Sequence, residues 1–452
     1  MTSYYQEHHS QFLDGLRAFL RIPSVSTLSE HKPDVRRAAE FVRDELRAAG
    51  MTVAELIEGD GNPLVYAEWL GAPGKPTVLF YGHYDVQPPD PLDEWKSPPF
   101  DPEIRGNDIF ARGSADDKGQ VYIQIKAVES LLKSTGKLPV NVKFLIEGEE
   151  EMGGEHIEAY VKSKPPRLKA DAAVVCDTEM FAPELPTICI GLRGIVYGEL
   201  WVEGANHDLH SGIYGGAAPN PIQGIAEILC ALKDKDGHIL IPGFYDRVVP
   251  ASPKERTAWA SLPFNERDYT EKEMGARELV GEPNVPLLER LWARPTLEVH
   301  GIRGGFTGEG AKTVIPARAV AKVSARLVAD QRPEEAASQL KAAVKAATPK
   351  GISAEFKVIH MGAPSLTNPD NRFIQAAAQA MKQIFGKETV YIRSGGSIPI
   401  VGLFDRYLGI PSVMMGFGLP DDNLHAPNEK FHLPNFFRGI ESVARYLELL
   451  GG

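Results

Sequence analysis

A disulfide scaffold, a membrane span and an export signal are all missing from this sequence of 452 residues. Its three cysteines, Cys176, Cys189 and Cys230, are an odd number without a C-x-x-C spacing, which favours a reducing compartment over a disulfide framework. No apolar run reaches the roughly 20 residues that a membrane-spanning helix needs. The first residues also lack the apolar core of a secretion signal. We therefore expect a cytoplasmic protein with no membrane partner and with inert thiols in its core.

Basic charge is also scarce. The chain holds 49 Lys and Arg against 60 Asp and Glu, and its formal net charge is −11 at pH 7. Nucleic-acid binding depends on a basic surface that neutralises phosphates, so we expect no nucleic-acid partner. Hydrophobic residues make up 43% of the chain and charged residues 24%, which is typical of a globular protein long enough for more than one core.

Strands and helices alternate in the first part of the chain. Amphipathic helices are expected at about 5–20 and 34–49, and another begins after Gly119. The expected strands are 52–57, 64–70, 77–81, 140–146 and 171–176, and after residue 368 two more lie near 389–393 and 412–415. Such alternation predicts an α/β fold, in which a mainly parallel sheet carries helices on both faces.

A different order of elements occupies the middle of the chain. The expected strands there are 195–203, 296–300, 313–328 and 353–360, with helices at about 220–233 and after Pro333. This β-α-β-β-α-β order is the split pattern of a small α+β domain. We predict a first domain made of residues 1–192 and 364–452, and an inserted second domain over 193–363. The segment 237–294 is rich in proline and charge, and we interpret it as a long insertion.

The stretch that begins at Tyr81 places polar residues at the end of a strand. The apolar run 76–81 has the length and composition of a buried strand, and His83 and Asp85 follow it. Ligands bind at the carboxyl ends of strands in open α/β sheets. Alternation points His83 and Asp85 the same way, so Asp85 can orient a metal-binding imidazole. A structural histidine at a strand end is the alternative.

Further candidates for metal ligands follow other predicted strands or lie in loops beside glycine or proline. With the first histidine, the set is His83, Asp116, Glu150, Glu151, Asp177 and His425. Imidazole and carboxylate ligands suit zinc or manganese. Two alternatives stay open: one of the adjacent carboxylates of Asp116 and Asp117 caps the next helix, or residues 149–151 are an exposed charge run.

Several stretches carry a resemblance to a known family. They are 82–86 (G-H-Y-D-V), 112–119 (R-G-S-A-D-D-K-G), 147–153 (E-G-E-E-E-M-G), Asp177 and 424–429 (L-H-A-P-N-E). In this order they resemble the co-catalytic zinc aminoacylase and carboxypeptidase family. The stretches 208–212 (D-L-H-S-G), 311–316 (A-K-T-V-I-P) and 395–399 (G-G-S-I-P) are most similar to its branch of carnosinases and cytosolic non-specific dipeptidases.

The resemblance implies a site for two divalent ions, Zn²⁺ or Mn²⁺. It makes His83 and Asp177 ligands of one ion, Glu151 and His425 ligands of the other, and Asp116 the bridge between them. Glu150 becomes the general base, and Asp85 a further residue of the catalytic site. The peptide bond between Asp116 and Asp117 is cis in this family.

The resemblance also implies a function for the inserted domain. It would be a lid through which two chains form a homodimer, with His210 reaching the active site of the partner. Thr313, Arg326, Gly396 and Ser397 match positions that bind substrate, and a guanidinium suits a bidentate grip on a carboxylate. The implied activity is hydrolysis of dipeptides by a metallodipeptidase. The alternatives are an N-acyl amino acid deacylase with the same chemistry, and a catalytically silent binding protein.

Overall fold

Contacts divide the chain into two compact units in the computed structural model, which describes residues 3–163 and 165–452. The first unit comprises the residues up to Ile190, Thr367–Ile392 and Leu403–Gly452. The second comprises Gly191–Leu366 and Arg393–Gly402. The domain boundaries expected from the sequence concern which segments fold independently, and they stay a prediction.

The first unit is built on a twisted sheet in the order β1-β2-β6-β3-β7-β17-β8. The strands β6, β3, β7 and β17 pair in parallel at its centre, whereas β1, β2 and β8 join in antiparallel fashion at its edges. These strands are β1 (Val53–Ile57), β2 (Leu64–Trp69), β3 (Thr77–His83), β6 (Asn141–Glu147), β7 (Ala172–Val175), β8 (Thr187–Leu192) and β17 (Ser412–Met414). The predicted α/β class is confirmed, although β8 and the antiparallel edges were not expected.

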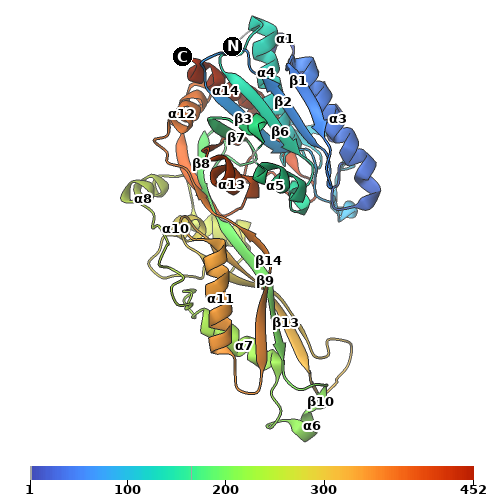
Figure 1. The fold of residues 1–452 in the computed structure, drawn as a ribbon, viewed down its shortest axis with the longest axis vertical. Helices are drawn as coiled ribbons and strands as arrows, with labels where there is room; N and C mark the ends of the chain where they lie inside the picture. Colours follow the sequence, from blue (N-terminus) through green and yellow to red (C-terminus); the bar gives the residue numbers. More distant parts are fainter. Residues whose placement is uncertain (1–2, 164) are drawn as a thin grey trace. The chain divides into compact units, whose positions relative to one another are not determined.

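Helices cover this sheet because alternate strand residues are apolar on both sides. Val78 and Phe80 of β3 lie in the main core with Phe144 of β6, and Phe80 stacks on Phe144 with ring centroids 5.0 Å apart. Tyr81 points to the other side, where its ring meets that of Phe404. Figure 1 shows the helices α3, α4, α12 and α14 beside the strands. The helices of this unit are α1 (Ser3–Glu7), α2 (His9–Leu20), α3 (Lys32–Ala49), α4 (Lys118–Thr135), α5 (Glu155–Lys162), α12 (Arg372–Phe385) and α14 (Leu433–Gly451).

Helix α4 is the helix most deeply enclosed by the first unit. All of its residues from Lys118 to Leu132 are buried, since α4 packs on β3 and against α3 and α14. It ends where Gly136 adopts a left-handed conformation with φ of 70°, a common helix terminator. Because its neighbours hold α4 along its length, the C-terminal end of the loop that precedes α4 is also held in place. That loop carries Asp116 and Asp117.

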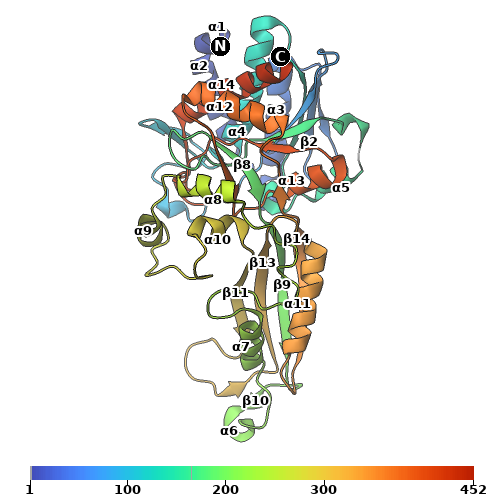
Figure 2. The same cartoon turned by 90° about the vertical axis from the view of Figure 1, so that its left-hand side faces the viewer.

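The second unit contains the predicted split pattern. Its sheet has the order β11-β13-β9-β14 and is antiparallel throughout. Figure 2 shows helices α7 and α11 beside this sheet, and both helices contact β9. The elements are β9 (Gly194–Glu203), α7 (Pro221–Leu232), β11 (Thr296–Gly304), β13 (Arg318–Leu327), α11 (Pro333–Ala347) and β14 (Ser353–Gly362). The β-α-β-β-α-β prediction is confirmed.

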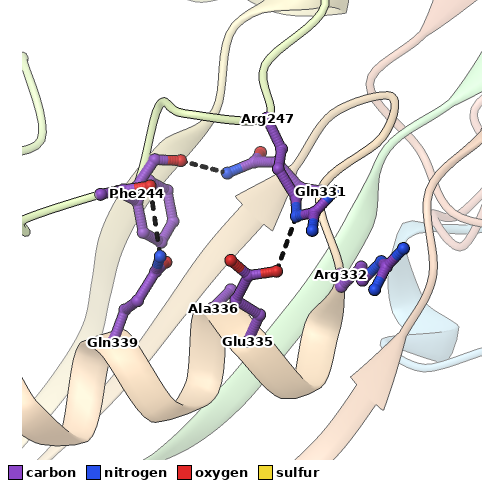
Figure 3. Close-up of a pocket in the computed structure, with 8 residues that line it drawn as sticks. Phe244, Arg247, Gln331, Arg332, Glu335, Ala336 and Gln339 are labelled. Carbon is purple, nitrogen blue, oxygen red and sulfur yellow. Dashed lines mark hydrogen bonds and ion pairs between the residues drawn. The ribbon is translucent and has the colours of Figure 1, made fainter.

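The insertion 237–294 is an ordered part of the second unit. It contains α8 (Pro253–Ala260), α9 (Glu266–Asp268), the π-helical turn η5 (Tyr269–Glu273) and α10 (Leu287–Ala293). Figure 3 shows how its first segment is attached to the start of α11 and the loop before it. Arg247 Nε donates to Glu335 at 2.7 Å, and Gln331 Nε2 donates to the carbonyl of Phe244 at 2.8 Å.

Short elements complete the structure. The strands β4 (Glu103–Arg105), β5 (Asp108–Phe110) and β18 (Lys430–His432) form a small sheet. The others are β10 (Leu209–His210), β12 (Val314–Ile315), β15 (Ser365–Leu366), β16 (Val390–Ser394), α6 (Ser211–Tyr214) and α13 (Pro399–Leu403).

Two sequence expectations concern the cysteines and the membrane. Cys176 and Cys189 are buried free thiols, but Cys230 is exposed on α7, so the expectation of three core thiols is wrong. Within residues 3–163 and 165–452, no helix combines the length and apolar character needed to cross a membrane. The cytoplasmic location and the lack of a nucleic-acid partner stay predictions.

We expect Phe80→Ala to lower the free energy of unfolding of the first unit by about 3–5 kcal/mol, because it opens a cavity between β3 and the helices. Chemical denaturation followed by fluorescence measures this. Leu92→Ala is the control, since Leu92 is 57% exposed in the same unit and its loss should change stability by less than about 0.5 kcal/mol. Equal effects of the two substitutions would contradict the packing described for β3.

Candidate metal centre

Three neighbouring strands deliver polar residues to one edge of the first unit's sheet. β3 ends at His83, directly opposite Glu147, the last residue of the parallel strand β6. β6 runs into the short 3₁₀ turn Glu150–Met152, and β7 is followed two residues later by Asp177. Because parallel strands end at the same edge, segments far apart in the sequence meet there.

Two loops add the remaining candidates. Asp116 precedes α4, and its peptide bond to Asp117 is cis, as the resemblance implied. His425 lies in the loop before β18 and adopts a left-handed conformation with φ of 60°. His83 is fully buried, whereas the side chain of His425 is 54% exposed. The cluster therefore has one closed side and one open side.

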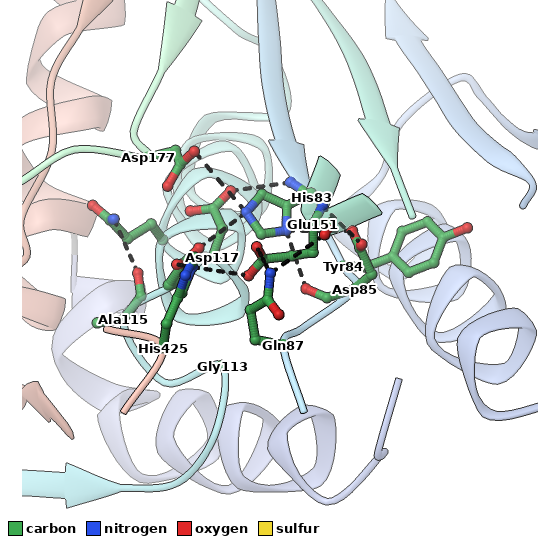
Figure 4. A network of polar contacts seen from close by, with 12 residues as sticks. His83, Tyr84, Asp85, Gln87, Gly113, Ala115, Asp117, Glu151, Asp177 and His425 are labelled. Carbon is green, nitrogen blue, oxygen red and sulfur yellow. Dashed lines mark hydrogen bonds and ion pairs between the residues drawn. The ribbon is translucent and has the colours of Figure 1, made fainter. Parts of the chain in front are cut away.

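Asp116 lies between the two histidines. Its Oδ1 is 3.1 Å from Nε2 of His83, and its Oδ2 is 2.9 Å from Nε2 of His425. On one flank Asp177 Oδ2 is 4.0 Å from Nε2 of His83, and on the other Glu151 Oε1 is 3.3 Å from Nε2 of His425. Figure 4 shows His83, His425, Glu151 and Asp177 converging. The structure thus brings together the five residues predicted as metal ligands.

Two groups of potential ligand atoms can be defined, each with its atoms within 4.8 Å of one another. One is Asp116, Glu151 and His425, and the other is His83, Asp117 and Asp177. Asp117 was not a predicted ligand. One of its oxygens accepts a hydrogen bond from the backbone N–H of His83 at 3.0 Å, and the other is buried without a hydrogen-bond partner among the described residues.

The capping alternative is wrong for the side chain of Asp117. Asp117 stands at the N-cap position of α4, but its carboxylate makes no capping hydrogen bond to that helix. Its bond to the backbone of His83 instead ties the loop before α4 to the end of β3. Asp117 therefore supports the histidine whose ring faces Asp116.

Asp85 and Gln87 continue the polar face that begins at His83. Asp85 is fully buried, and its backbone carbonyl is the hydrogen-bond partner of Nδ1 of His83 at 3.1 Å, while its carboxylate Oδ1 lies 3.4 Å from the same nitrogen; both can orient the ring. Its Oδ2 accepts the backbone N–H of Glu151 at 3.2 Å. Gln87 Nε2 donates to the carboxylate of Glu151 at 2.8 Å. We had not predicted Gln87, although extending the alternation of His83 and Asp85 by two residues would have indicated it.

The three consecutive glutamates have different environments, so the interpretation as an exposed charge run is wrong. Glu149 is 8% exposed and accepts backbone N–H groups of Asn62 and His156. Glu151 faces His425. Glu150 is also largely enclosed, and no described residue donates a hydrogen bond to its carboxyl group. Its oxygens are therefore available to a ligand.

The charges of the cluster act strongly on one another. Burial and, after it, the charge of Asp116 together raise the pKa of Asp177 to about 7. Burial also raises the pKa of Glu150 well above its ordinary value, with a contribution from Asp177. The hydrogen bonds to Asp116 and Glu151 raise the pKa of His425 to about 10. The chain alone thus retains protons at a site where its carboxylates crowd together.

This donor set fits divalent cations. Imidazole nitrogens and carboxylate oxygens converge in two groups, and Asp117, a member of one group, has a buried oxygen without a hydrogen-bond partner among the described residues. A cation relieves repulsion between carboxylates that otherwise need protons to coexist. The two oxygens of Asp116 face opposite histidines, which is the arrangement that a bridging carboxylate requires.

The residues predicted to bind substrate lie in the second unit, where Arg326 and Ser397 are hydrogen-bonded to each other. Arg326 Nη1 donates to Oγ of Ser397 at 2.9 Å, and Ser397 donates to the carbonyl of Arg193 at 2.6 Å. The backbone N–H of Arg193 donates to the carbonyl of Gly396 at 3.1 Å. His210 and Thr313 lie on paired segments: His210 of β10 is opposite Val314 of β12, and the N–H of the next residue, Ser211, donates to the carbonyl of Thr313 at 3.1 Å.

A comparison with protein families identifies the chain's relatives. The model of peptidase family M20/M25/M40 matches residues 79–449. The chain belongs to this family. The match spans every residue of the metal cluster, so the cluster lies within the segment that defines the family.

Individual relatives match over almost the whole chain. Cys-Gly metallodipeptidase DUG1 of Candida albicans is 34% identical over 469 residues, which cover 99% of this chain and 96% of the relative. Beta-Ala-His dipeptidase of Homo sapiens is 32% identical over 461 residues, covering 98% and 90%. The M20 family metallo-carboxypeptidase Sso-CP2 from Sulfolobus solfataricus has a solved structure with a TM-score of 0.86 and 34% identity, covering 97% and 99%.

These findings confirm the resemblance to the dipeptidase branch, the fold class and the prediction of an enzyme in the metallodipeptidase class. The individual roles of the site residues stay predictions.

If Asp116 bridges two ions, its single carboxylate is a ligand of both. Asp116→Ala should therefore lose both ions. Elemental analysis of protein equilibrated with zinc or manganese and then gel-filtered gives the occupancy. His425→Ala is the comparison, and we expect it to retain about one ion per chain, since His425 belongs to only one of the two groups. Undiminished occupancy in Asp116→Ala would exclude Asp116 as a bridge.

Proposed function

We propose that the protein is a metallodipeptidase that hydrolyses the peptide bond of dipeptides. The observation that carries the proposal is the pair of ligand groups joined by Asp116. It occurs in a chain that matches a Cys-Gly metallodipeptidase and a Beta-Ala-His dipeptidase over nearly its full length.

His83, Asp116 and Asp177 would hold one divalent ion, and Asp116, Glu151 and His425 the other. We propose zinc or manganese, because both accept imidazole together with carboxylate oxygen. When bound, such ions supply Lewis acidity to the substrate carbonyl and to the attacking water.

Glu150 is the proposed general base. Its carboxyl group is enclosed, has no hydrogen-bond donor among the described residues, and lies next in sequence to Glu151. It takes a proton from the attacking water and returns a proton to the leaving amine when the peptide bond breaks. Asp85 holds the His83 ring in place during this cycle.

Arg326 is the proposed anchor for the carboxylate at the C-terminus of the substrate. It is half-buried, its guanidinium donates a hydrogen bond to the neutral hydroxyl of Ser397, and burial lowers the pKa of this guanidinium. Nearby Arg193 is also half-buried, and burial together with the charge of Arg326 lowers its pKa to about 10. Two half-buried arginines in one hydrogen-bonded group favour an anionic ligand.

Two other activities use the same chemistry. The metallo-carboxypeptidase relative favours the removal of C-terminal residues from longer peptides as a second candidate, since it covers 97% of this chain. An N-acyl amino acid deacylase would differ only in the pockets that hold the substrate. The intact ligand set and Glu150 argue against a silent binding protein.

A substrate panel separates these candidates. Wild-type protein with added zinc or manganese is incubated with free dipeptides, dipeptides amidated at the C-terminus, N-acetyl and N-succinyl amino acids, and tetrapeptides. We expect cleavage of free dipeptides and a KM at least 10-fold higher for amidated ones, because the amide removes the charge that Arg326 would bind. Cleavage of acylated amino acids or tetrapeptides with dipeptides untouched would overturn the proposal.

We expect Glu150→Gln to keep its metal ions and to lose at least a factor of about 100 in kcat, because the amide preserves the shape of the side chain but accepts no proton. Glu151→Gln should instead weaken metal binding. Elemental analysis and steady-state kinetics on both variants give the comparison. The reverse result would exchange the two roles.

We further propose that two chains form a homodimer and that His210 acts in the active site of the partner, where it stabilises the oxyanion of the tetrahedral intermediate. His210 is exposed on the two-stranded ribbon of β10 and β12. Its Nδ1 accepts the backbone N–H of Gly212 at 3.0 Å, so Nε2 carries the hydrogen and can donate to a ligand.

Mixing inactive Glu150→Ala and His210→Ala proteins should restore activity to roughly a quarter of the wild-type value. Random exchange makes half of the dimers mixed, and each mixed dimer has one complete site. Subunit exchange is verified with two tags on the chains, and each protein mixed with itself is the control. No recovery despite verified exchange would show that His210 acts within its own chain.

A further inference from the structure

Glu429 is a buried carboxylate that lies outside the proposed ligand set. It is fully buried, and its side chain accepts four hydrogen bonds, all from the segment 112–116. The donors are Arg112 Nη1 at 2.8 Å, the N–H of Gly113 at 2.9 Å, the N–H of Ala115 at 2.9 Å and the N–H of Asp116 at 3.2 Å.

The segment that Glu429 holds carries the proposed bridging ligand. Three of the four donors are backbone N–H groups, and the last belongs to Asp116 itself. The carbonyl of Glu429 also accepts the N–H of Ala111 at 3.1 Å. Glu429 thus holds the loop before α4 through both its side-chain carboxylate and its main-chain carbonyl.

Glu429 also belongs to the loop that carries His425. It follows this histidine by four residues, and its position is fixed by the start of β18 (Lys430–His432), which pairs with β5. The loops of His425 and Asp116 are more than 300 residues apart in the sequence, since their hydrogen bond spans 309 positions. Within the described residues, the carboxylate of Glu429 is the group of the His425 loop that binds the backbone of the Asp116 loop.

We propose that Glu429 is a positioning residue that sets the distance between Asp116 and His425, so that the two side chains can share a metal ion. It belongs to neither group of potential ligand atoms. The proposal rests on the metal site of the proposed function, but not on dipeptide hydrolysis. Its physical basis is that the ligand geometry in a metal site depends on the groups that hold the ligands.

Because this arrangement is buried, a substitution of Glu429 acts directly on its hydrogen-bond partners. Glu429 and Arg112 are each 1% exposed, so the negative charge has a buried cation and backbone dipoles as its partners. Glu429→Gln leaves the shape nearly unchanged but places an amide NH₂ where each neighbour is itself a donor. The loop of Asp116 must then shift to avoid facing donors toward one another.

Asp422 offers a matched control in the same loop. It is also fully buried, accepts the N–H of Leu419 at 2.7 Å and lies 3.3 Å from Nζ of Lys430. None of these partners is a proposed ligand or a neighbour of Asp116. Asp422→Asn therefore replaces a buried carboxyl group of the same loop that makes no hydrogen bond to the loop before α4.

The experiment measures Zn²⁺ affinity by competition with a chromogenic chelator for wild type, Glu429→Gln and Asp422→Asn, with far-UV circular dichroism and metal-free melting temperatures as the check of folding. We expect Glu429→Gln to bind the weaker zinc ion 10-fold to 100-fold less tightly, and Asp422→Asn to remain within about 3-fold of wild type. Folded Glu429→Gln with unchanged affinity overturns the proposal. Equal losses in both variants also overturn it, because they would reflect general loosening of the loop.

Should Glu429→Gln not fold, Glu429→Asp decides by the same comparison. It keeps the charge beside Arg112, but it is shorter by one methylene group and cannot reach all of the backbone donors. Reduced zinc affinity with a normal far-UV spectrum supports the proposal, and wild-type affinity overturns it. A wild-type protein that binds two zinc ions but cleaves no dipeptide would refute the proposed function and leave this inference intact.

Discussion

Repulsion among carboxylates at one edge of a parallel sheet is the constraint on which the site depends. Asp116, Glu150, Glu151 and Asp177 converge there because the carboxyl ends of neighbouring strands and the loop before α4 meet at this edge. Burial raises the pKa of Glu150 and Asp177, so the bare chain keeps protons where metal ions would be bound. Repulsion among the carboxylates thus explains both why the site suits cations and why the pKa values of its acids depend on their neighbours.

This cluster is held in place largely by hydrogen bonds from backbone N–H groups to buried side-chain carboxylates. Asp117 accepts the N–H of His83, and Asp85 accepts the N–H of Glu151. Glu429 accepts the N–H groups of the loop before α4. Each such carboxylate is fully buried, and each fixes the main chain of a ligand or of its neighbour. Precision in the site therefore comes from links between segments that are distant in sequence, on a scaffold of strands and a buried helix.

The sequence was most informative where chemistry coincides with periodicity. Strand ends with polar residues indicated His83 and Asp177 as ligand candidates, and the resemblance paired them at one ion; the structure places them 4.0 Å apart, because the carboxyl ends of parallel strands meet at one edge. Periodicity could not distinguish the environments of Glu149, Glu150 and Glu151, because a 3₁₀ turn follows β6 and no repeat fixes which side chain points inward; the distinction between Glu150 and Glu151 came from the family resemblance. The antiparallel edges of the sheet were equally hidden, since short strands such as β8 give no sign of their direction before their partners are known.

The division of the chain has a consequence for engineering. The second unit is built from two separate stretches, Gly191–Leu366 and Arg393–Gly402, so the chain passes between the units at four points. A metal-binding fragment cannot be obtained by a single excision, because removing the longer stretch alone leaves ten residues without their neighbours. Among them Arg393 is 3% exposed and donates to the carboxylate of Glu255, which would be deleted. A minimal fragment therefore needs two splices, one joining residues 190 and 367 and one joining residues 392 and 403.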